Sequence, residues 1–184
     1  MVSIKYWGKC ANLSTKVLKD HFPYAAHEQY ETGQLSDDDF FQMVKNALPQ
    51  PNGLIDVNFW EGWDRLILNE TKTVELLPIL KNSYGIYLLS NTNHRHIQHE
   101  LEKRFSFQNQ VHRTFYSFEM GCRKPEKEIF LKALKNINTN PEECLFIDDM
   151  ETNVTQAKSL GFHTIHFTGF NNLTTELYQI GITL

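Results

Sequence analysis

The sequence predicts an α/β protein with a parallel sheet and a small, separate helical lobe. Three observations lead to this class. Strand-like and helix-like segments alternate from about residue 69 to residue 184, whereas residues 1–68 have helical patterns and no clear buried strand. In the alternating part, the apolar run 144–147 ends at two adjacent carboxylates. With 184 residues, of which 41% are hydrophobic, the chain can bury one core and carry a small second lobe.

Composition narrows the classes of function. The chain has 18 basic and 22 acidic residues, a net charge of -4 and no long run of either sign, which argues against a nucleic-acid-binding protein. Cys10, Cys122 and Cys144 are far apart, so we expect neither disulfides nor a zinc site, and a reducing cytoplasm as the location. The first residues lack the apolar core of a leader peptide, and no run is long enough for a membrane helix.

The predicted helical lobe contains two well-defined helices. One begins after Ser36 and continues to Val44, and the helix dipole explains the acids 37–39 in its first turn. The other covers residues 55–68 and carries aromatic residues at helical spacing, which more often form a core than a ligand platform. Residues 2–6 alternate apolar and polar side chains and can form a short strand.

The predicted core begins with a helix over residues 71–82, which Thr71 can cap, and a buried strand over residues 84–89. This strand ends at Ser90-Asn91-Thr92-Asn93. At the carboxyl end of a parallel strand, the Ser90 hydroxyl and the backbone N–H groups of the turn can hold phosphate oxygens. The same residues also suit an ordinary turn and helix cap, so both interpretations stay open.

The next segments contain candidate cationic groups. A His-x-His-x-x-His cluster spans residues 94–99, but its first two histidines do not share a helix face, so we do not expect zinc there. A short strand over residues 114–118 leads to Lys124, which precedes Pro125 and a helix over 126–134. Lys124 can offer a compact positive charge to a phosphate, although most surface lysines have no such role.

The most informative stretch is residues 144–167. The apolar run 144–147 indicates a strand buried on both faces, and it ends at Asp148 and Asp149. A helical pattern follows over residues 154–160, and then a second apolar run. Neighbouring carboxylates at a strand end repel each other unless a cation intervenes, and Mg²⁺ prefers such oxygen ligands. Alternatively, either aspartate simply caps the helix that follows.

Taken in order along the chain, these pieces resemble the haloacid dehalogenase superfamily of hydrolases. In its pattern Ser90-Asn91 would be the second motif, Lys124 the third and Asp148-Asp149 the fourth. The signatures are similar to those of the subgroup that contains bacterial sugar-phosphate phosphatases and the N-terminal phosphatase domain of soluble epoxide hydrolase; they are Leu88–Asn93, Gly121–Pro125, and Phe146–Asp149 with Asn153. The resemblance covers nearly the whole chain. It implies a Rossmann-like core at residues 69–184 and a small helical cap at residues 1–68.

The resemblance also implies a role for each matching residue. Asp149 would bind Mg²⁺ directly, Asp148 would act through water or a hydrogen bond, and Asn153 would orient both acids. Ser90 and Asn91 would bind the transferring phosphate of a small phosphorylated substrate. Lys124 would neutralise that phosphate and tie it to the acidic cluster.

The first motif of the family is not apparent. It is an apolar strand that ends in Asp-x-Asp and supplies the nucleophile, whereas the earliest aspartates here, Asp20 and residues 37–39, follow no buried strand. We therefore expect a magnesium-dependent phosphatase whose sequence starts late, lacks the first core strand and is inactive as it stands. Alternatives are a non-catalytic relative that binds phosphate or a protein partner, a decayed remnant, and a 2-haloacid dehalogenase. Without the central strand, the exposed sheet edges can pair two copies of the chain.

Overall fold

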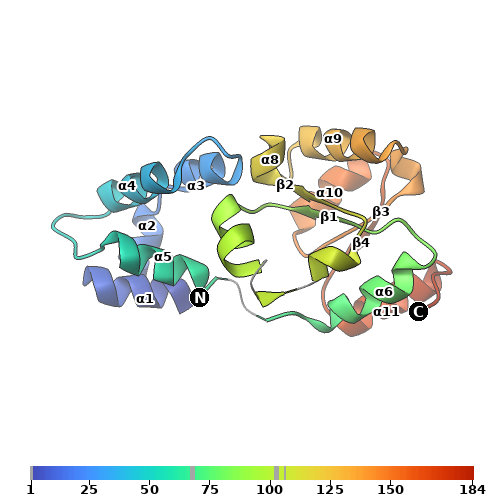
Figure 1. Ribbon diagram of the computed structural model, residues 1–184, viewed down its shortest axis with the longest axis horizontal. Helices are drawn as coiled ribbons and strands as arrows, with labels where there is room; N and C mark the ends of the chain where they lie inside the picture. Colours follow the sequence, from blue (N-terminus) through green and yellow to red (C-terminus); the bar gives the residue numbers. More distant parts are fainter. Residues whose placement is uncertain (1, 67–68, 102–103, 106) are drawn as a thin grey trace. The chain divides into compact units, whose positions relative to one another are not determined.

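The computed structural model describes residues 2–66, 69–101, 104–105 and 107–184. The chain folds as two compact units. Unit 1 comprises Met1–Asn69 and Thr92–Phe105, and unit 2 comprises Glu70–Asn91 and Ser106–Leu184. The elements of unit 1 are α1 (Val2–Ala11), α2 (Thr15–His21), α3 (Tyr24–Glu31), α4 (Asp37–Ala47), α5 (Asp56–Asp64) and the π-helix η2 (His96–Leu101) (Figure 1).

The elements of unit 2 alternate between helix and strand as expected. They are η1 (Lys72–Glu75), α6 (Leu76–Lys81), β1 (Tyr87–Ser90), η3 (Phe107–Gln110), β2 (Arg113–Tyr116), α8 (Ser117–Met120), α9 (Lys127–Ile137), η4 (Pro141–Glu143), β3 (Leu145–Asp148), α10 (Glu151–Ser159), β4 (His163–His166) and α11 (Phe170–Gln179). The helix expected over residues 71–82 is divided into η1 and α6, and Thr71 makes no side-chain cap hydrogen bond.

Two sequence predictions about unit 1 have opposite outcomes. The capped helix is confirmed, because the Ser36 hydroxyl accepts a hydrogen bond from the Asp39 N–H at the start of α4. The short strand at residues 2–6 is wrong, because these residues form the first turns of α1. Trp7 and Ala11, one helical turn apart, are both buried, so the helix covers more apolar surface than an isolated strand would.

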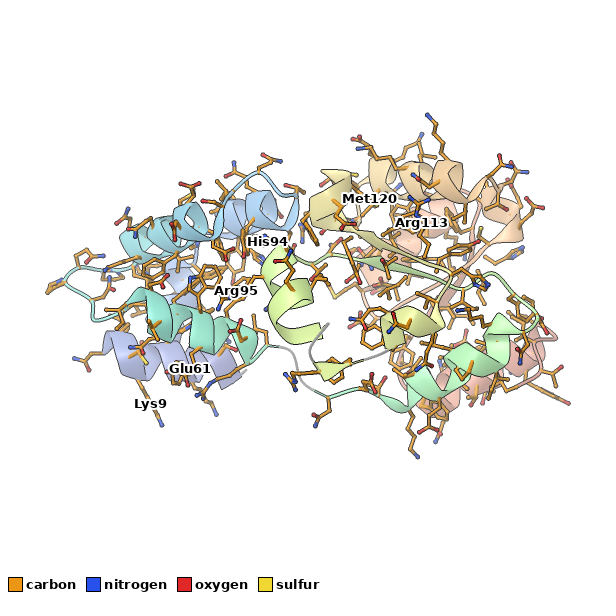
Figure 2. The ribbon with its side chains drawn as sticks, in the orientation of Figure 1. Lys9, Glu61, His94, Arg95, Arg113 and Met120 are labelled. Atoms are coloured by element: carbon orange, nitrogen blue, oxygen red, sulfur yellow. The ribbon has the colours of Figure 1, made fainter. Side chains whose placement is uncertain are left out.

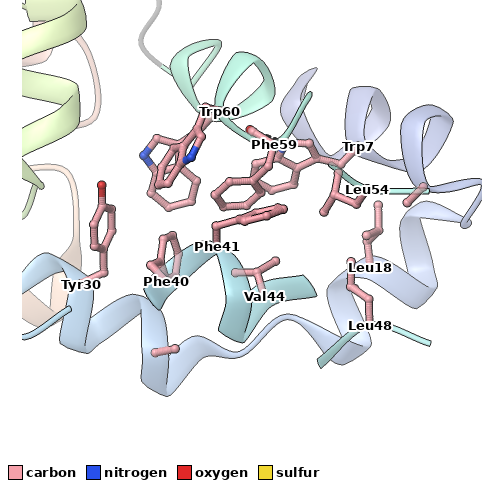
Figure 3. Packing of buried hydrophobic residues seen from close by; sticks show 13 residues of the cluster. Trp7, Leu18, Tyr30, Phe40, Phe41, Val44, Leu48, Leu54, Phe59 and Trp60 are labelled. Atoms are coloured by element: carbon pink, nitrogen blue, oxygen red, sulfur yellow. Dashed lines mark hydrogen bonds between the residues drawn. The ribbon is translucent and has the colours of Figure 1, made fainter. Parts of the chain in front are cut away.

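The core of unit 1 is a cluster of aromatic rings between its helices (Figure 3). Phe59 stacks on Trp7 at a centroid distance of 5.1 Å and meets Trp60 edge-on at 4.7 Å. Tyr30 stacks on Phe40 at 4.4 Å. These contacts confirm that the aromatic residues of α5 form a core.

The segment after β1 belongs to unit 1 rather than to unit 2. The Arg95 guanidinium donates to both carboxylate oxygens of Asp64 in α5, at 3.1 and 3.2 Å. The His96 ring stacks on Trp63 at 5.3 Å. Because these contacts join the segment to α5, Thr92–Phe105 is part of the helical unit although it follows the first strand in the sequence.

Unit 2 contains two pairs of parallel strands. β1 pairs with β2, with Ser90 opposite Tyr116, and β3 pairs with β4, with Asp148 opposite His166. The helix α10 connects β3 to β4, which makes this part a βαβ unit. The two pairs are separate sheets within the described residues.

Helices cover both faces of the strands of unit 2 (Figure 1), and apolar clusters lie between the helices and the strands. On one face, Leu76 of α6 and Leu173 and Leu177 of α11 pack around Ile165 of β4. On the other face, Phe130 of α9 and Ala157 of α10 form a cluster against which Phe146 of β3 packs. The strands therefore lie between two helical layers, as the alternating pattern predicts.

The expectation that the strand at residues 144–147 is buried on both faces is wrong. Ile147 in β3 is 36% exposed, and Leu145 and Phe146 are only half-buried. Continuous apolar sequence predicts a strand whose two faces are both fully covered. In the described residues β3 has one strand neighbour, so its side chains lack the flanking side chains that a second neighbouring strand would place on the same face.

The free strand edges can be identified from the backbone hydrogen bonds. The backbone carbonyls of Cys144 and Asp148 accept hydrogen bonds from the β4 side of β3. The backbone N–H and C=O groups of the alternate residues, Leu145 and Ile147, therefore point away from β4. By the same rule Ile86 O faces β2, and the carbonyl of Leu89 faces away from it. β1 and β3 thus each present one edge with no strand partner among the described residues.

Candidate active site

The centre of the candidate site is a buried ion pair between Lys124 and Asp148. The Lys124 Nζ atom lies 2.6 Å from Asp148 Oδ2, and the two side chains are only 10% and 6% exposed. Nζ also donates to the carbonyl oxygen of Leu89 in β1, at 2.8 Å. The lysine ammonium group therefore connects the end of β1 to the end of β3.

Asp148 is fully engaged by hydrogen bonds. Oδ1 accepts from the Met150 N–H and from the Asn153 side-chain amide, each at 2.9 Å, while Oδ2 accepts from Lys124. Asn153 lies in the first turn of α10 and is 5% exposed. The carboxylate at the end of β3 is thus held in one orientation by groups from the turn, the helix and the lysine.

Asp149 differs from its neighbour. It is exposed, and no hydrogen bond to its side chain is found among the described residues, whereas its backbone carbonyl accepts from His166 Nε2 at 3.0 Å. Since Asp149 is exposed and both oxygens of Asp148 accept hydrogen bonds, the Asp149 carboxylate is the one of the pair that is accessible to a metal ion. The sequence pattern contains no signal for the contact with His166, which depends on the register of β3 and β4.

The turn after β1 supplies the remaining predicted residues. Ser90 is the last residue of β1 and is half-buried. The side chain of the next residue, Asn91, makes two hydrogen bonds with the backbone of Lys124: Nδ2 donates to its carbonyl oxygen at 2.7 Å, and Oδ1 accepts from its N–H at 2.8 Å. All six predicted site residues therefore lie in unit 2, at the strand ends and on the elements that follow them.

A second polar cluster lies in unit 1 and was not predicted. Asp37 is the first residue of α4, and its carboxylate accepts a hydrogen bond from the Tyr30 hydroxyl. The carboxylate also lies 3.1 Å from His94 Nε2 and 3.7 Å from Arg95, the two partners that are labelled in Figure 2. From the sequence, the helix dipole alone accounts for this acid. Its partners come from distant parts of the chain, so a local pattern does not indicate them.

The cysteines and the histidines after β1 are the remaining candidates for a nucleophile or a metal ligand. Burial raises the pKa of the Cys122 and Cys144 thiols, so neither is an activated nucleophile. His96 contacts Asn93 and the Trp63 carbonyl, and the side chain of His99 lies outside the described residues. Among the residues with described side chains, no group of three or more His, Cys, Asp or Glu could hold a metal.

None of the described helices has the length and apolar character of a membrane span.

Fold and site together define a class. An α/β core that gathers a hydroxyl, a buried cation and adjacent acids at the carboxyl ends of parallel strands has the groups that bind a phosphoryl group and a hard cation. The profile of the haloacid dehalogenase-like hydrolases matches residues 16–161. The chain belongs to this family, as the sequence motifs predict.

Two of the relatives that the chain resembles are phosphatases by name. D-ribitol-5-phosphate phosphatase of Bacteroides thetaiotaomicron is 28% identical over 160 residues, which cover 84% of this chain and 76% of the relative. The sesquiterpene phosphatase astK of Aspergillus oryzae is 26% identical over 153 residues, which cover 83% of this chain and 78% of the relative.

Solved structures confirm the fold. A HAD family enzyme from Bacteroides thetaiotaomicron superposes with a TM-score of 0.78 at 26% identity, covering 89% of this chain and 83% of the enzyme. The same enzyme in complex with magnesium and inorganic phosphate gives a TM-score of 0.69 at 25% identity, with coverage of 89% and 84%. The Rossmann-like α/β class predicted from the sequence is therefore confirmed.

Proposed function

We propose that this chain is a magnesium-dependent phosphatase of small phosphorylated metabolites such as sugar phosphates. The observation that carries the proposal is the buried Lys124–Asp148 pair at the carboxyl ends of β1 and β3. A buried lysine ammonium next to a strand-end turn supplies a fixed positive charge where a phosphate binds. The phosphatase relatives and the magnesium and phosphate complex of a structural neighbour support this assignment.

In this proposal the Ser90 hydroxyl and the turn N–H groups hold the phosphate oxygens, and Lys124 neutralises their charge. A lysine ammonium has three N–H donors, and two of them are used by Leu89 O and Asp148. The third donor is available for a phosphate oxygen. Such preorganised donors stabilise the charge that develops during phosphoryl transfer.

The residues present fit a magnesium ion that is shared with the substrate. Asp149 offers an exposed carboxylate, whereas both oxygens of Asp148 already accept hydrogen bonds. Asp149 would therefore bind the ion directly. Asp148, which is hydrogen-bonded to Asn153, would help to orient the site. Mg²⁺ is commonly held by one or two carboxylates, several waters and a substrate phosphate, so one accessible carboxylate is compatible with this mode. When bound, the ion neutralises charge on the phosphate oxygens.

The nucleophile is the part of the reaction that the described residues do not supply. Asp20 lies in α2 and forms an ion pair with Lys16, and the acids at residues 37–39 lie in the first turn of α4. All of them belong to unit 1, and none follows a strand. This placement favours the second candidate function, a non-catalytic relative that binds a phosphorylated ligand.

The two candidates are separated by measuring binding and turnover on the same protein. Titration with inorganic phosphate in the presence and absence of Mg²⁺ reports the binding site. A panel of sugar phosphates and other phosphomonoesters then reports phosphate release. Magnesium-dependent binding with hydrolysis supports the phosphatase, and binding without hydrolysis supports the non-catalytic relative. No binding of phosphate would contradict both candidates.

A third alternative is a 2-haloacid dehalogenase. The adjacent acids favour phosphoryl chemistry over metal-free dehalogenation, so we expect no halide release from 2-haloacids.

The proposal also covers the cellular location of the protein and its assembly. The three free cysteines are compatible with the reducing conditions of the cytoplasm. The free edges of β1 and β3 can pair with the same edges of a second copy, because unpaired parallel strands present rows of backbone donors and acceptors. We therefore propose a homo-oligomer that forms through the sheet edge.

A further inference from the structure

The side-chain amide of Asn91, the residue directly after β1, is engaged in hydrogen bonds. The amide forms a closed pair with one residue on another loop, donating to Lys124 O at 2.7 Å and accepting from Lys124 N–H at 2.8 Å. Only this orientation of the amide matches a donor to an acceptor at both contacts, since the reverse orientation would oppose two acceptors and two donors.

Two bonds to both backbone groups of one residue restrain it as a neighbouring strand would. Lys124 precedes α9 and lies outside any regular element, so no ladder of a sheet or helix fixes its backbone. The amide of Asn91 supplies that restraint from the residue directly after β1. The position of the Lys124 Cα atom is thereby tied to the turn that contains Ser90.

The side chain of Lys124 leads back to the same strand. Its Nζ donates to Leu89 O at 2.8 Å and pairs with Asp148 at 2.6 Å. The lysine is thus held at both ends, its backbone by Asn91 and its ammonium by Leu89 and Asp148. With two of the three ammonium donors fixed, the direction of the third donor is fixed as well.

We propose that Asn91 is a positioning residue that aims the Lys124 ammonium at the phosphate, rather than a residue whose side chain binds the phosphate. This inference rests on the proposed phosphate site. It replaces the direct role that the family resemblance implies for the Asn91 side chain, because that amide is already engaged with Lys124. The backbone N–H of Asn91 is unaffected by this assignment.

The test is a double-mutant cycle on the affinity for inorganic phosphate in the presence of Mg²⁺. Asn91→Leu keeps the size of the side chain and removes both bonds, and we expect it to weaken phosphate binding about tenfold. In a Lys124→Met background, the same change has no further effect if Asn91 acts through Lys124. Equal losses in both backgrounds would overturn the inference, because they indicate a direct contact with phosphate.

A second readout does not depend on phosphate binding. The ¹⁵N resonance of the Lys124 ammonium reports its hydrogen bonds, and we expect a slowly exchanging signal in the native protein. Asn91→Leu should move this signal to the position of the surface lysines while the backbone spectrum of unit 2 is kept. Asn91→Ser, whose shorter side chain lacks the two separate amide atoms that reach the two backbone groups, should give an intermediate effect and serves if the leucine variant does not fold.

The exposed Asn172→Leu is the matched control and should change neither readout. If the native protein binds no phosphate, the proposed function fails, and the resonance of Lys124 still decides the positioning role. An unchanged Lys124 signal in both Asn91 variants would overturn that role.

Discussion

Lys124 and Asp148 form a buried ion pair at the end of β3. The ammonium of Lys124 and the carboxylate of Asp148 are both removed from water, and such a pair is costly to break because the remaining charge stays buried. Lys124→Met should therefore destabilise unit 2 by about 3–5 kcal/mol. Urea unfolding followed by far-UV circular dichroism measures this loss.

The control for that prediction is another lysine with a carboxylate partner. Lys132 lies 2.7 Å from Glu128, but its side chain is 41% exposed. Solvent screens exposed ion pairs, so Lys132→Met should cost much less than Lys124→Met. Similar losses in the two variants would show that the Lys124 pair is not buried in solution.

Gly62 is a second residue whose role depends on its neighbour. In the interior of α5, a glycine costs about 1 kcal/mol relative to alanine. A Cβ atom at this position would overlap the indole of Trp7, whose Cε2 atom would lie at 2.9 Å and other ring atoms closer. Trp7 is 4% exposed and donates to Phe59 O, so it has little room to move.

We therefore expect Gly62→Ala to destabilise unit 1 by about 1–3 kcal/mol, because overpacking outweighs the gain in helix propensity. Thermal unfolding followed by tryptophan fluorescence measures the effect, since all three tryptophans lie in unit 1. In a Trp7→Phe background the same substitution should cost less. A stabilising effect of Gly62→Ala in the native background would contradict the contact.

At the scale of the elements, Tyr30 connects α3 to the start of α4. Its ring is 1% exposed and stacks on Phe40, and its hydroxyl donates to Asp37. Burial, and then the hydrogen bond to Asp37, raise the pKa of Tyr30 well above its usual value of 10.0. The folded protein therefore keeps this proton at a pH where the unfolded chain releases it.

A folded-state pKa that is raised contributes stability below the unfolded pKa, and this contribution is lost as the pH rises above it. Above pH 10.0, the stability of unit 1 should fall by about 1.4 kcal/mol for each pH unit from this group alone. Tyr30→Phe should be less stable at pH 8 because the bond to Asp37 is lost, and should show a shallower decline at alkaline pH. Urea midpoints between pH 8 and pH 11 test this.

The exposed Tyr24 provides the control for Tyr30. It is 63% accessible and belongs to the same helix, α3, so Tyr24→Phe removes a phenol without removing the bond to Asp37. This variant should follow the native protein across the pH range. An identical alkaline decline in Tyr30→Phe and the native protein would mean that Tyr30 does not cause it.

At the scale of the whole molecule, the sequence predicted the features that depend on local pattern. The strands are found within a few residues of the predicted runs, because apolar stretches bounded by turn residues identify them. Lys124 lies between α8 and α9 and not at a strand end, so its contact with Asp148 was implied by the family resemblance and not by the strand pattern. The contact between Asn91 and the Lys124 backbone was not predictable, because it depends on the path of two loops.

Two further differences also have physical causes. Residues 2–6 alternate apolar and polar side chains as a strand does, but they form a helix that buries the following Trp7 in the core of unit 1. The segment Thr92–Phe105 joins unit 1 through contacts such as Arg95 with Asp64, which link positions far apart in the sequence. Tertiary contacts therefore fix which unit a segment belongs to, and periodicity does not contain that information.

The free edge of β3 leads to a prediction about assembly. Ile147 is 36% exposed beside backbone groups that have no strand partner among the described residues. A lysine at such an edge opposes pairing with another chain, because it places charge where a second strand would lie. If copies associate through this edge, Ile147→Lys should weaken association about tenfold or more, which is about 1.4 kcal/mol. Sedimentation velocity over a range of protein concentrations measures the change.

The control is Val57→Lys, which also replaces an exposed β-branched residue with lysine, at a 68% exposed position of α5, and should leave association unchanged. A native protein that remains monomeric at all concentrations, or equal effects of the two substitutions, would show that the sheet edge does not mediate assembly.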